Sequence, residues 1–87
     1  MENNVTVDTI EDRVKNILAE NLSVSSNDIK MDDMLVEDLG ADSLDIVEIV
    51  MALEDEFNIT ISEDDAIGLL TVKELTDYVN RHMYHAK

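Results

Sequence analysis

The segment EDLGADSLDIVEIVMALEDEF, residues 37–57, decides the fold of this 87-residue chain. It begins with acidic, glycine and small polar residues, and it continues with apolar residues at the spacing of an α-helix. The pattern predicts a helix from Ser43 to Phe57, which the segment NITI (58–61) ends. On a helical wheel, one arc of about 100° collects the side chains that would face a core, namely Ile46, Ile49, Val50, Leu53 and Phe57.

A second apolar stripe on this helix, the outer stripe, consists of Leu44, Val47 and Met51 and lies mostly opposite the first. One interpretation is a central helix that touches neighbours on both sides. We favour an exposed docking surface, because burying the carboxylates around these three residues would be costly. Exposed carboxylates would form a rim that attracts basic partners and sets their orientation. They belong to Asp45, Glu48, Glu54 and Asp55.

The chain is strongly acidic, with 21 acidic residues against 6 basic ones and a formal net charge of −15. Such a surface repels nucleic acids and anionic lipid headgroups, attracts partners with Lys/Arg patches and opposes self-association, so we expect a monomer. The sequence has no cysteine, so it forms no disulfides and any thiol chemistry needs an added group. No apolar run reaches membrane-spanning length and the acidic N-terminus is unlike a signal peptide, which predicts a cytoplasmic protein without membrane insertion.

Three further helices are expected around the central one. The first begins near Asp8, where DTIE (8–11) offers an acidic cap, and ends at Leu22 before the polar segment SVSSND (23–28). An irregular stretch then leads to Asp42. A loop of about twenty residues is unusual in a compact domain, and such loops tend to position something functional.

Two shorter patterns complete the predicted fold. Ser62 can cap a short third helix in EDDAIGLL (63–70), which Gly68 limits to a turn or two. Thr71 and Glu74 form a capping box for a last helix, with a buried face of Val72, Leu75, Val79 and Met83. The prediction is therefore all-α: a small four-helix bundle of three longer helices and a short third one, with a long loop between the first two. It would be a single domain over residues 1–87, frayed at 1–6 and 83–87.

Ser43, taken alone, is most simply a residue at a helix start, and Asp42 can serve equally well as the cap. Hydrolase-type catalysis needs an adjacent base, whereas His82 and His85 are near the C-terminus and the sequence has no G-x-S-x-G motif. A hydroxyl at the end of a long loop is instead presented to other enzymes. A phosphate attached there would meet the positive end of the helix dipole, but Asp42 and Asp45 oppose it, which favours a mobile attachment.

Residues 37–57 resemble the signature of acyl carrier proteins, particularly the discrete carriers of type II fatty-acid synthesis, and the resemblance continues through TVKELTDYV (71–79). The triplet Asp42-Ser43-Leu44 matches the family's 4′-phosphopantetheine attachment site. The resemblance implies that a carrier-protein synthase (a phosphopantetheinyl transferase) transfers this arm from coenzyme A to Ser43. Acyl intermediates of fatty-acid biosynthesis would then travel as thioesters on the arm between enzymes, and the chain itself would not be an enzyme.

The resemblance also implies two groups of binding residues. Partner enzymes with basic patches would dock on Leu44, Val47, Glu48 and Met51, with acidic contacts from Asp45, Glu54 and Asp55. The acyl chain would be sheltered between the second and third helices by residues that are each also explained as core: Ile46, Val50, Leu53, Phe57, Ile61, Ala66 and Leu69. The chain departs from the commonest family pattern at Ser23, Ser62 and Gly68, which leaves the shape of the third helix open.

Other functions remain open on the sequence. The same arm could carry the cargo of polyketide, peptide or other specialised pathways. A different class is an acidic interaction or cation-binding protein, but SEDDAIG (62–68) lacks the alternating oxygen ligands and terminal glutamate of an EF-hand loop. We therefore predict no metal site and interpret the acidic rows as solvated, partner-facing surface.

Overall fold

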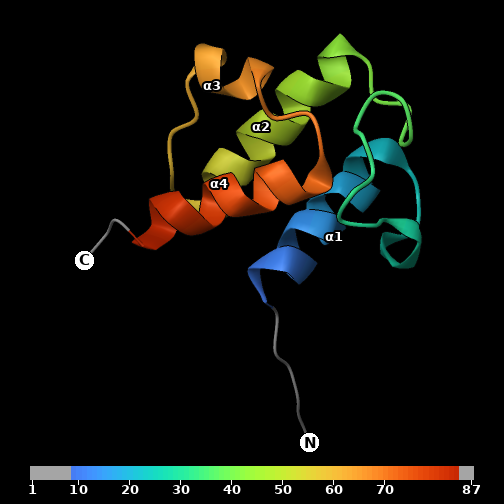
Figure 1. The fold of residues 1–87 in the computed structure, drawn as a ribbon, viewed down its shortest axis with the longest axis horizontal. Helices are drawn as coiled ribbons and strands as arrows, with labels where there is room; N and C mark the ends of the chain where they lie inside the picture. Colours follow the sequence, from blue (N-terminus) through green and yellow to red (C-terminus); the bar gives the residue numbers. More distant parts are fainter. Residues whose placement is uncertain (1–8, 85–87) are drawn as a thin grey trace, which may run out of the picture.

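The computed structural model describes residues 9–84 of the chain. These residues form four α-helices and one short 3-10 helix, joined by loops (Figure 1). In chain order they are α1 (Ile10–Leu22), η2 (Ser26–Asp28), α2 (Ser43–Phe57), α3 (Glu63–Ile67) and α4 (Val72–Tyr84). Residues 9–84 contain no strand, only an isolated bridge between Met34 and Thr71. The predicted all-α bundle, with a short third helix and a long loop before α2, is confirmed.

α2 begins and ends where its sequence predicts, because residues at both ends satisfy the free backbone groups. Asp42 accepts a hydrogen bond from the Asp45 N–H (2.9 Å) at the start, and Asn58 adopts the left-handed conformation (φ 56°) at the end. α3 likewise follows Ser62, whose hydroxyl accepts a hydrogen bond from the Asp65 N–H (3.1 Å). The predicted cap of this short helix is therefore confirmed.

The observed cap of α1 lies one residue after the predicted one, Asp8. Thr9 caps the helix, because its hydroxyl accepts a hydrogen bond from the Asp12 N–H (3.1 Å), and α1 begins at Ile10. Aspartate and threonine are both favoured caps, so DTIE offers two adjacent choices that composition alone cannot separate. Asp8 itself lies outside the described residues.

α4 begins where predicted but extends further toward the C-terminus than predicted. The Glu74 N–H donates to the Thr71 hydroxyl (3.1 Å) and the Thr71 N–H to the Glu74 carboxylate (3.1 Å), which is the predicted capping box. The helix continues through Tyr84 instead of fraying at Met83, because Met83 packs against the core one turn after buried Val79. The other residues predicted to fray, 1–6 and 85–87, lie outside the described residues.

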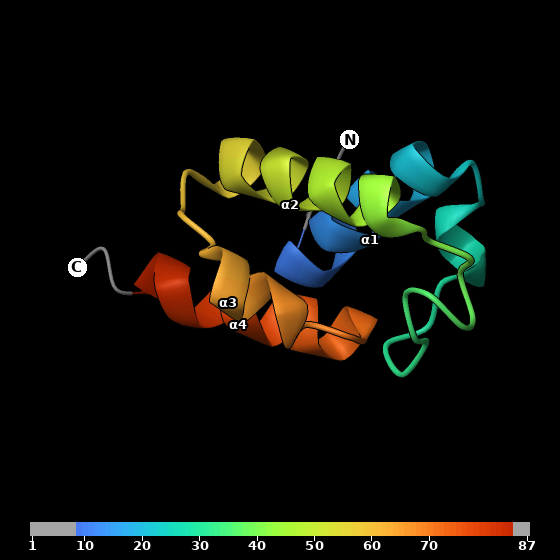
Figure 2. The same ribbon diagram turned by 90° about the horizontal axis from the view of Figure 1, so that it is seen from above.

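The core lies among α1, α2 and α4 (Figures 1 and 2). The predicted inner face of α2 is buried at its centre and end, whereas Ile46 and Val50 are only half-buried. Arg13 of α1 adds a link to the end of α2, since its guanidinium contacts the Glu56 carboxylate (2.8 Å) and lies 4.6 Å above the Phe57 ring. The buried apolar side chains are Val14, Leu18, Ile29, Leu35, Ala41, Ile49, Leu53, Phe57, Ile61, Val72, Leu75, Tyr78 and Val79.

The long loop of residues 23–42 is fastened to the connection between α3 and α4. The Leu35 N–H donates to the Leu70 carbonyl (2.9 Å), and the Val72 N–H donates to the Asp33 carbonyl (3.1 Å). Leu35 is also buried in the core. Because both its backbone and its side chains are held, the loop can fix the position of the residues that enter α2.

Candidate functional site

Ser43 is the first residue of α2, and it is exposed. The helix is capped by Asp42 and not by Ser43: Asp42 accepts from the Asp45 N–H (2.9 Å), and the Asp42 N–H donates to the Asp45 carboxylate (3.1 Å). The Ser43 hydroxyl forms no hydrogen bond with another group of residues 9–84. Ser43 therefore lies at a helix start, as predicted, but Asp42 is the cap, and the serine oxygen is left accessible to a reagent.

The backbone just before Ser43 is set by two neighbouring residues. Gly40 has φ +75°, the left-handed region that only glycine adopts at little cost, and a Cβ there would meet nothing within 4 Å. The constraint at this glycine is therefore conformational and not steric. Ala41 is buried, and its N–H donates to the Leu35 carbonyl (2.9 Å). Together they turn the fastened loop into the start of α2.

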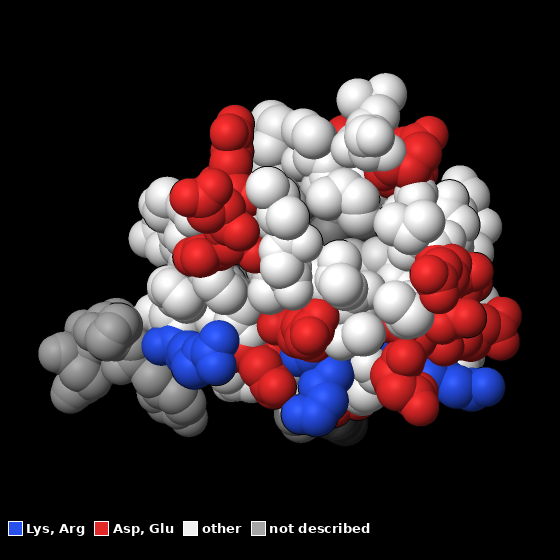
Figure 3. Space-filling view, turned by 45° about the horizontal axis from the view of Figure 1, so that its top comes forward, with Lys and Arg blue, Asp and Glu red and all other residues white. Residues whose placement is uncertain are grey.

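The outer stripe lies open to solvent next to this serine. Leu44, Val47 and Met51 are 65%, 52% and 61% exposed, so the interpretation that α2 touches neighbours on both faces fails within residues 9–84. Glu48 and Asp55 are exposed beside the stripe. Figure 3 shows this side of the molecule, where uncharged side chains occupy the middle and groups of acidic side chains surround them.

Two of the four acidic residues predicted to contact partners already bind the backbone. Asp45 belongs to the capping box, and the Glu54 carboxylate accepts a hydrogen bond from the Ile61 N–H (2.8 Å). Both side chains belong to half-buried residues. The sequence pattern did not reveal the Glu54 contact, because it joins two positions separated by the end of α2.

Two apolar clefts lie between α2, α3 and the long loop, one on each side of Ile46 and Ala66. The first has a volume of about 290 Å³ and opens at the outer stripe; its lining is Ile46, Val47, Val50, Met51, Glu54, Ile61, Glu63 and Ala66. The second has a volume of about 350 Å³; its lining is Met34, Leu35, Val36, Glu37, Ile46, Ala66, Ile67, Leu69 and Leu70. Ile46 lies one turn after Ser43, so both clefts begin close to the serine.

Five of the seven predicted acyl-pocket residues line these clefts, and two do not. Leu53 and Phe57 are core residues that line neither cleft, because they lie on the most deeply buried part of the α2 inner face. The five that do are Ile46, Val50, Ile61, Ala66 and Leu69. The residues that the long loop contributes, and Leu70 of the α3–α4 connection, were not predicted. The sequence shows that most of these residues are apolar. Which cleft or surface they line depends on how the loop is fastened to the α3–α4 connection.

Tyr78 and Thr76 are buried in α4 although the predicted inner face omits them. The Tyr78 hydroxyl donates a hydrogen bond to the Asp65 carboxylate in α3 (2.7 Å). The Tyr78 ring stacks on His82, with ring centroids 3.9 Å apart and planes at 16°. Burial, followed by the Asp65 hydrogen bond and charge, raises the pKa of Tyr78 from 10.0 to about 12. The phenol is therefore a neutral hydrogen-bond donor at physiological pH.

The raised pKa of Tyr78 predicts how the free energy of unfolding changes at alkaline pH. The folded state holds the Tyr78 proton more tightly than the unfolded chain does, so the resulting stability is present below pH 10 and is lost as pH rises through about 12. Between these values, the free energy of unfolding should fall more steeply in the wild type than in Tyr78→Phe. Urea denaturation at several pH values measures both slopes, and parallel curves would contradict the prediction.

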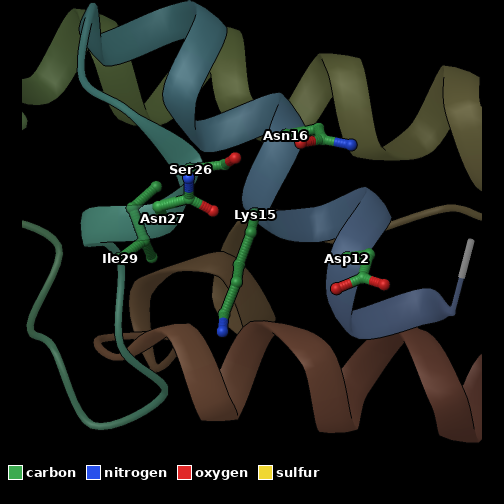
Figure 4. Close-up of a pocket in the computed structure, with 6 residues that line it drawn as sticks. All are labelled: Asp12, Lys15, Asn16, Ser26, Asn27 and Ile29. Atoms are coloured by element: carbon green, nitrogen blue, oxygen red, sulfur yellow. The ribbon is translucent and has the colours of Figure 1, made fainter.

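A polar hollow of about 360 Å³ lies between α1 and η2 (Figure 4). Asp12, Lys15 and Asn16 line it from α1, opposite Ser26 and Asn27. Within this hollow, Lys15 is paired with Glu11 (3.1 Å). No group of three or more potential metal ligands (His, Cys, Asp or Glu) occurs among residues 9–84.

The described residues bring no histidine to Ser43. His82 lies in the last turn of α4, and that turn lies at the opposite end of the bundle from the start of α2 (Figures 1 and 2). The His82 ring contacts the Tyr78 carbonyl (2.9 Å).

None of the helices within residues 9–84 is long and apolar enough to cross a membrane.

These features fit a covalently attached arm. Ser43 offers an accessible hydroxyl, the helix cap does not consume it, and apolar clefts start one turn away. Residues 12–79, most of the chain, match the protein family described as "Phosphopantetheine attachment site". Members of this family carry covalently attached 4′-phosphopantetheine, bear acyl thioesters on it and work with a synthase and other enzymes. The chain therefore belongs to the phosphopantetheine attachment site family of carrier proteins.

Proposed function

We propose that Ser43 bears the 4′-phosphopantetheine arm and that the chain is a non-enzymatic acyl carrier of fatty-acid biosynthesis. The observation that carries this assignment is the exposed Ser43 hydroxyl, which the Asp42 cap leaves free at the first turn of α2. The absence of a histidine near Ser43 among residues 9–84, together with the engagement of Asp42 and Asp45 in the capping box, supports a substrate of other enzymes over a catalyst. The phosphopantetheinyl transferase supplies the activation that the chain lacks.

The residues around Ser43 keep the attachment point fixed and the arm free. The capping box holds the backbone of the first turn, so the attachment point has a fixed position at the start of α2. Asp42 and Asp45 place negative charge beside the phosphodiester, which offsets the attraction of the helix N-terminus. When bound, the arm supplies the thiol that the cysteine-free chain does not encode.

The clefts support a fatty-acyl cargo. Their lining is mainly aliphatic, and burying a saturated chain against it is favoured by about 25 cal/mol for each Å² of apolar surface removed from water. A polyketide intermediate, with its many carbonyl and hydroxyl groups, would leave polar groups without partners there. Five of the predicted pocket residues, Ile46, Val50, Ile61, Ala66 and Leu69, are the proposed lining.

Intact-mass measurement tests the carrier function directly. The purified protein is incubated with coenzyme A, magnesium and a phosphopantetheinyl transferase, and the expected result is a mass gain of one phosphopantetheine unit at the peptide containing Ser43. The modified protein should then support elongation in a reconstituted type II fatty-acid synthase. Modification without elongation would contradict the fatty-acid assignment and leave the carrier function standing.

The outer stripe and its exposed acids are the proposed docking surface for partner enzymes. Glu48→Lys should raise the KM of the transferase and of the synthase enzymes about tenfold, equivalent to about 1.4 kcal/mol, because a basic partner then meets a like charge. Met51→Ala should also weaken partner use through lost apolar contact. Glu20→Lys, exposed on α1, makes the same change in net charge away from the stripe.

Steady-state kinetics of the four proteins check this prediction, with circular dichroism to show unchanged helix content. Equal KM values for Glu48→Lys and Glu20→Lys would contradict a specific docking surface.

The net charge of −15 supports a monomer and basic partners. A cytoplasmic location stays a prediction from the sequence.

A further inference from the structure

α3 is the helix that the core holds least. It has five residues, none of them buried, and it makes few contacts with the other helices. A helix of this length has little stability of its own. It lies above α4 and faces α2 across the first cleft (Figure 2). The position of α3, and with it the width of the cleft, therefore depends on a few specific contacts.

Two charge-assisted hydrogen bonds make those contacts. The Ile61 N–H, just before α3, donates to the Glu54 carboxylate at 2.8 Å, which joins this end to α2. The Tyr78 hydroxyl donates to the Asp65 carboxylate at 2.7 Å, which joins α3 to α4. Bonds of this type are shorter and stronger than those between neutral groups.

The Tyr78 side of the second bond is rigid. Tyr78 is 5% exposed in the core, and its ring stacks on His82. If α3 moves, the hydroxyl therefore cannot follow Asp65. An O–H···O bond of 2.7 Å weakens once the oxygens separate beyond about 3 Å, so a shift of α3 by roughly half an ångström already strains it.

The Asp65 bond joins α3 to α4, and neither Asp65 nor Tyr78 lines the first cleft. Ala66, the next residue, lines that cleft opposite Ile46 and Val50. A chain that enters deeply between α2 and α3 pushes α3 away from α2, and this movement pulls Asp65 from Tyr78. A short chain fits without the movement, whereas a long one requires it.

We propose that the Tyr78–Asp65 hydrogen bond is a latch on α3, hinged at the Glu54–Ile61 contact, and that it limits the length of acyl chain the cleft accepts. The inference rests on the proposed acyl-carrier function and adds Tyr78 and Asp65 as positioning residues for the cargo. They act through α3, because neither of them lines the cleft.

Melting temperatures of acyl-loaded proteins test the latch. The transferase loads butyryl, octanoyl and dodecanoyl groups from the corresponding acyl-coenzyme A onto wild type, Tyr78→Phe and Asp65→Ala. In the wild type, a dodecanoyl chain must break the bond, whereas in the variants it is already absent. The difference in Tm between the dodecanoyl and butyryl forms should therefore be about 4–8 °C larger in either variant than in the wild type, the shift expected for one hydrogen bond in a domain of this size.

Two matched controls separate the latch from general stability. Thr76→Val removes another buried α4 hydroxyl, which donates to the Val72 carbonyl (2.9 Å) and does not touch α3. Asp64→Ala removes the neighbouring exposed carboxylate of α3. A purely structural loss lowers Tm equally for all chain lengths, so both controls should keep the wild-type chain-length dependence. The double variant Tyr78→Phe/Asp65→Ala should equal either single variant in this difference.

The outcomes distinguish the latch from the function on which it rests. If the wild type is not loaded, or if Tm depends on chain length in neither the wild type nor the two variants, the proposed cargo site fails and the latch fails with it. If the wild type shows the dependence and both variants show the same dependence, only the latch is overturned. If Tyr78→Phe does not fold, Asp65→Ala, altered at an exposed position, decides the matter alone.

Discussion

Ser43→Ala is expected to abolish phosphopantetheine attachment completely while leaving the fold unchanged. The substitution removes the hydroxyl that would form the phosphodiester, and no cysteine is present to replace it as a nucleophile. The helix should survive, because Asp42 and not Ser43 caps it; an exposed substitution of this kind changes the free energy of unfolding by less than about 0.5 kcal/mol. Intact mass after treatment with coenzyme A and transferase measures the first effect, and urea denaturation the second.

Ser62→Ala is the matched control for this result. Ser62 is also an exposed serine at the start of a helix, but its hydroxyl accepts a hydrogen bond from the Asp65 N–H (3.1 Å) as the cap of α3. This variant should lose about 1 kcal/mol of stability and keep full modification. A mass gain in Ser43→Ala, or its loss in Ser62→Ala, would contradict the assignment of Ser43.

Leu53→Ala should produce the largest loss of stability among substitutions in α2. Leu53 is 0% exposed in the core, and truncating a fully buried leucine costs about 3 kcal/mol through lost burial and the cavity left behind. Because small domains are stable by only about 5–15 kcal/mol, this is a large share of the total. Thermal unfolding should show Tm lower by roughly 12 °C or more.

Val47→Ala, on the same helix, should affect the use of the protein by partner enzymes and not its stability. Val47 is 52% exposed in the outer stripe, so the variant should change the free energy of unfolding by less than about 0.5 kcal/mol. Its effect should appear instead as weaker use by partner enzymes. Equal destabilisation by the two variants would mean that the two faces of α2 do not have separate roles.

α2 could be predicted from the sequence because its signals are local. The apolar period gives its inner face, and Asp42 and Asn58 mark its ends within one or two residues of the helix. The exposed outer stripe followed from the same period, combined with the cost of burying the acids around it. The cap of α1 was placed one residue too early for an equally local reason: two good caps are adjacent in the sequence, and the backbone uses Thr9.

The clefts and the support of α3 could be predicted only in part, because they depend on contacts between distant positions. Glu54 was predicted to be a surface acid, but its carboxylate accepts a hydrogen bond from the Ile61 N–H. Tyr78 was not assigned to the inner face of α4, but it is buried and its hydroxyl donates to the Asp65 carboxylate. Neither pairing leaves a periodic signal. The five predicted residues that line the clefts lie on or next to helices, whereas the contribution of the long loop depends on where that loop is fastened.

The fastening of the long loop has a consequence for the newly synthesised chain. The loop that presents Ser43 is held by the backbone of Leu70 and Val72, which leave the ribosome well after the serine does. Chains grow at roughly 5–20 residues per second, so Ser43 spends a short interval outside the ribosome before the residues that fix its surroundings exist. The geometry of the attachment site is therefore complete only after residues 70–72 have left the ribosome, and a transferase that requires this geometry acts on Ser43 only from that point on.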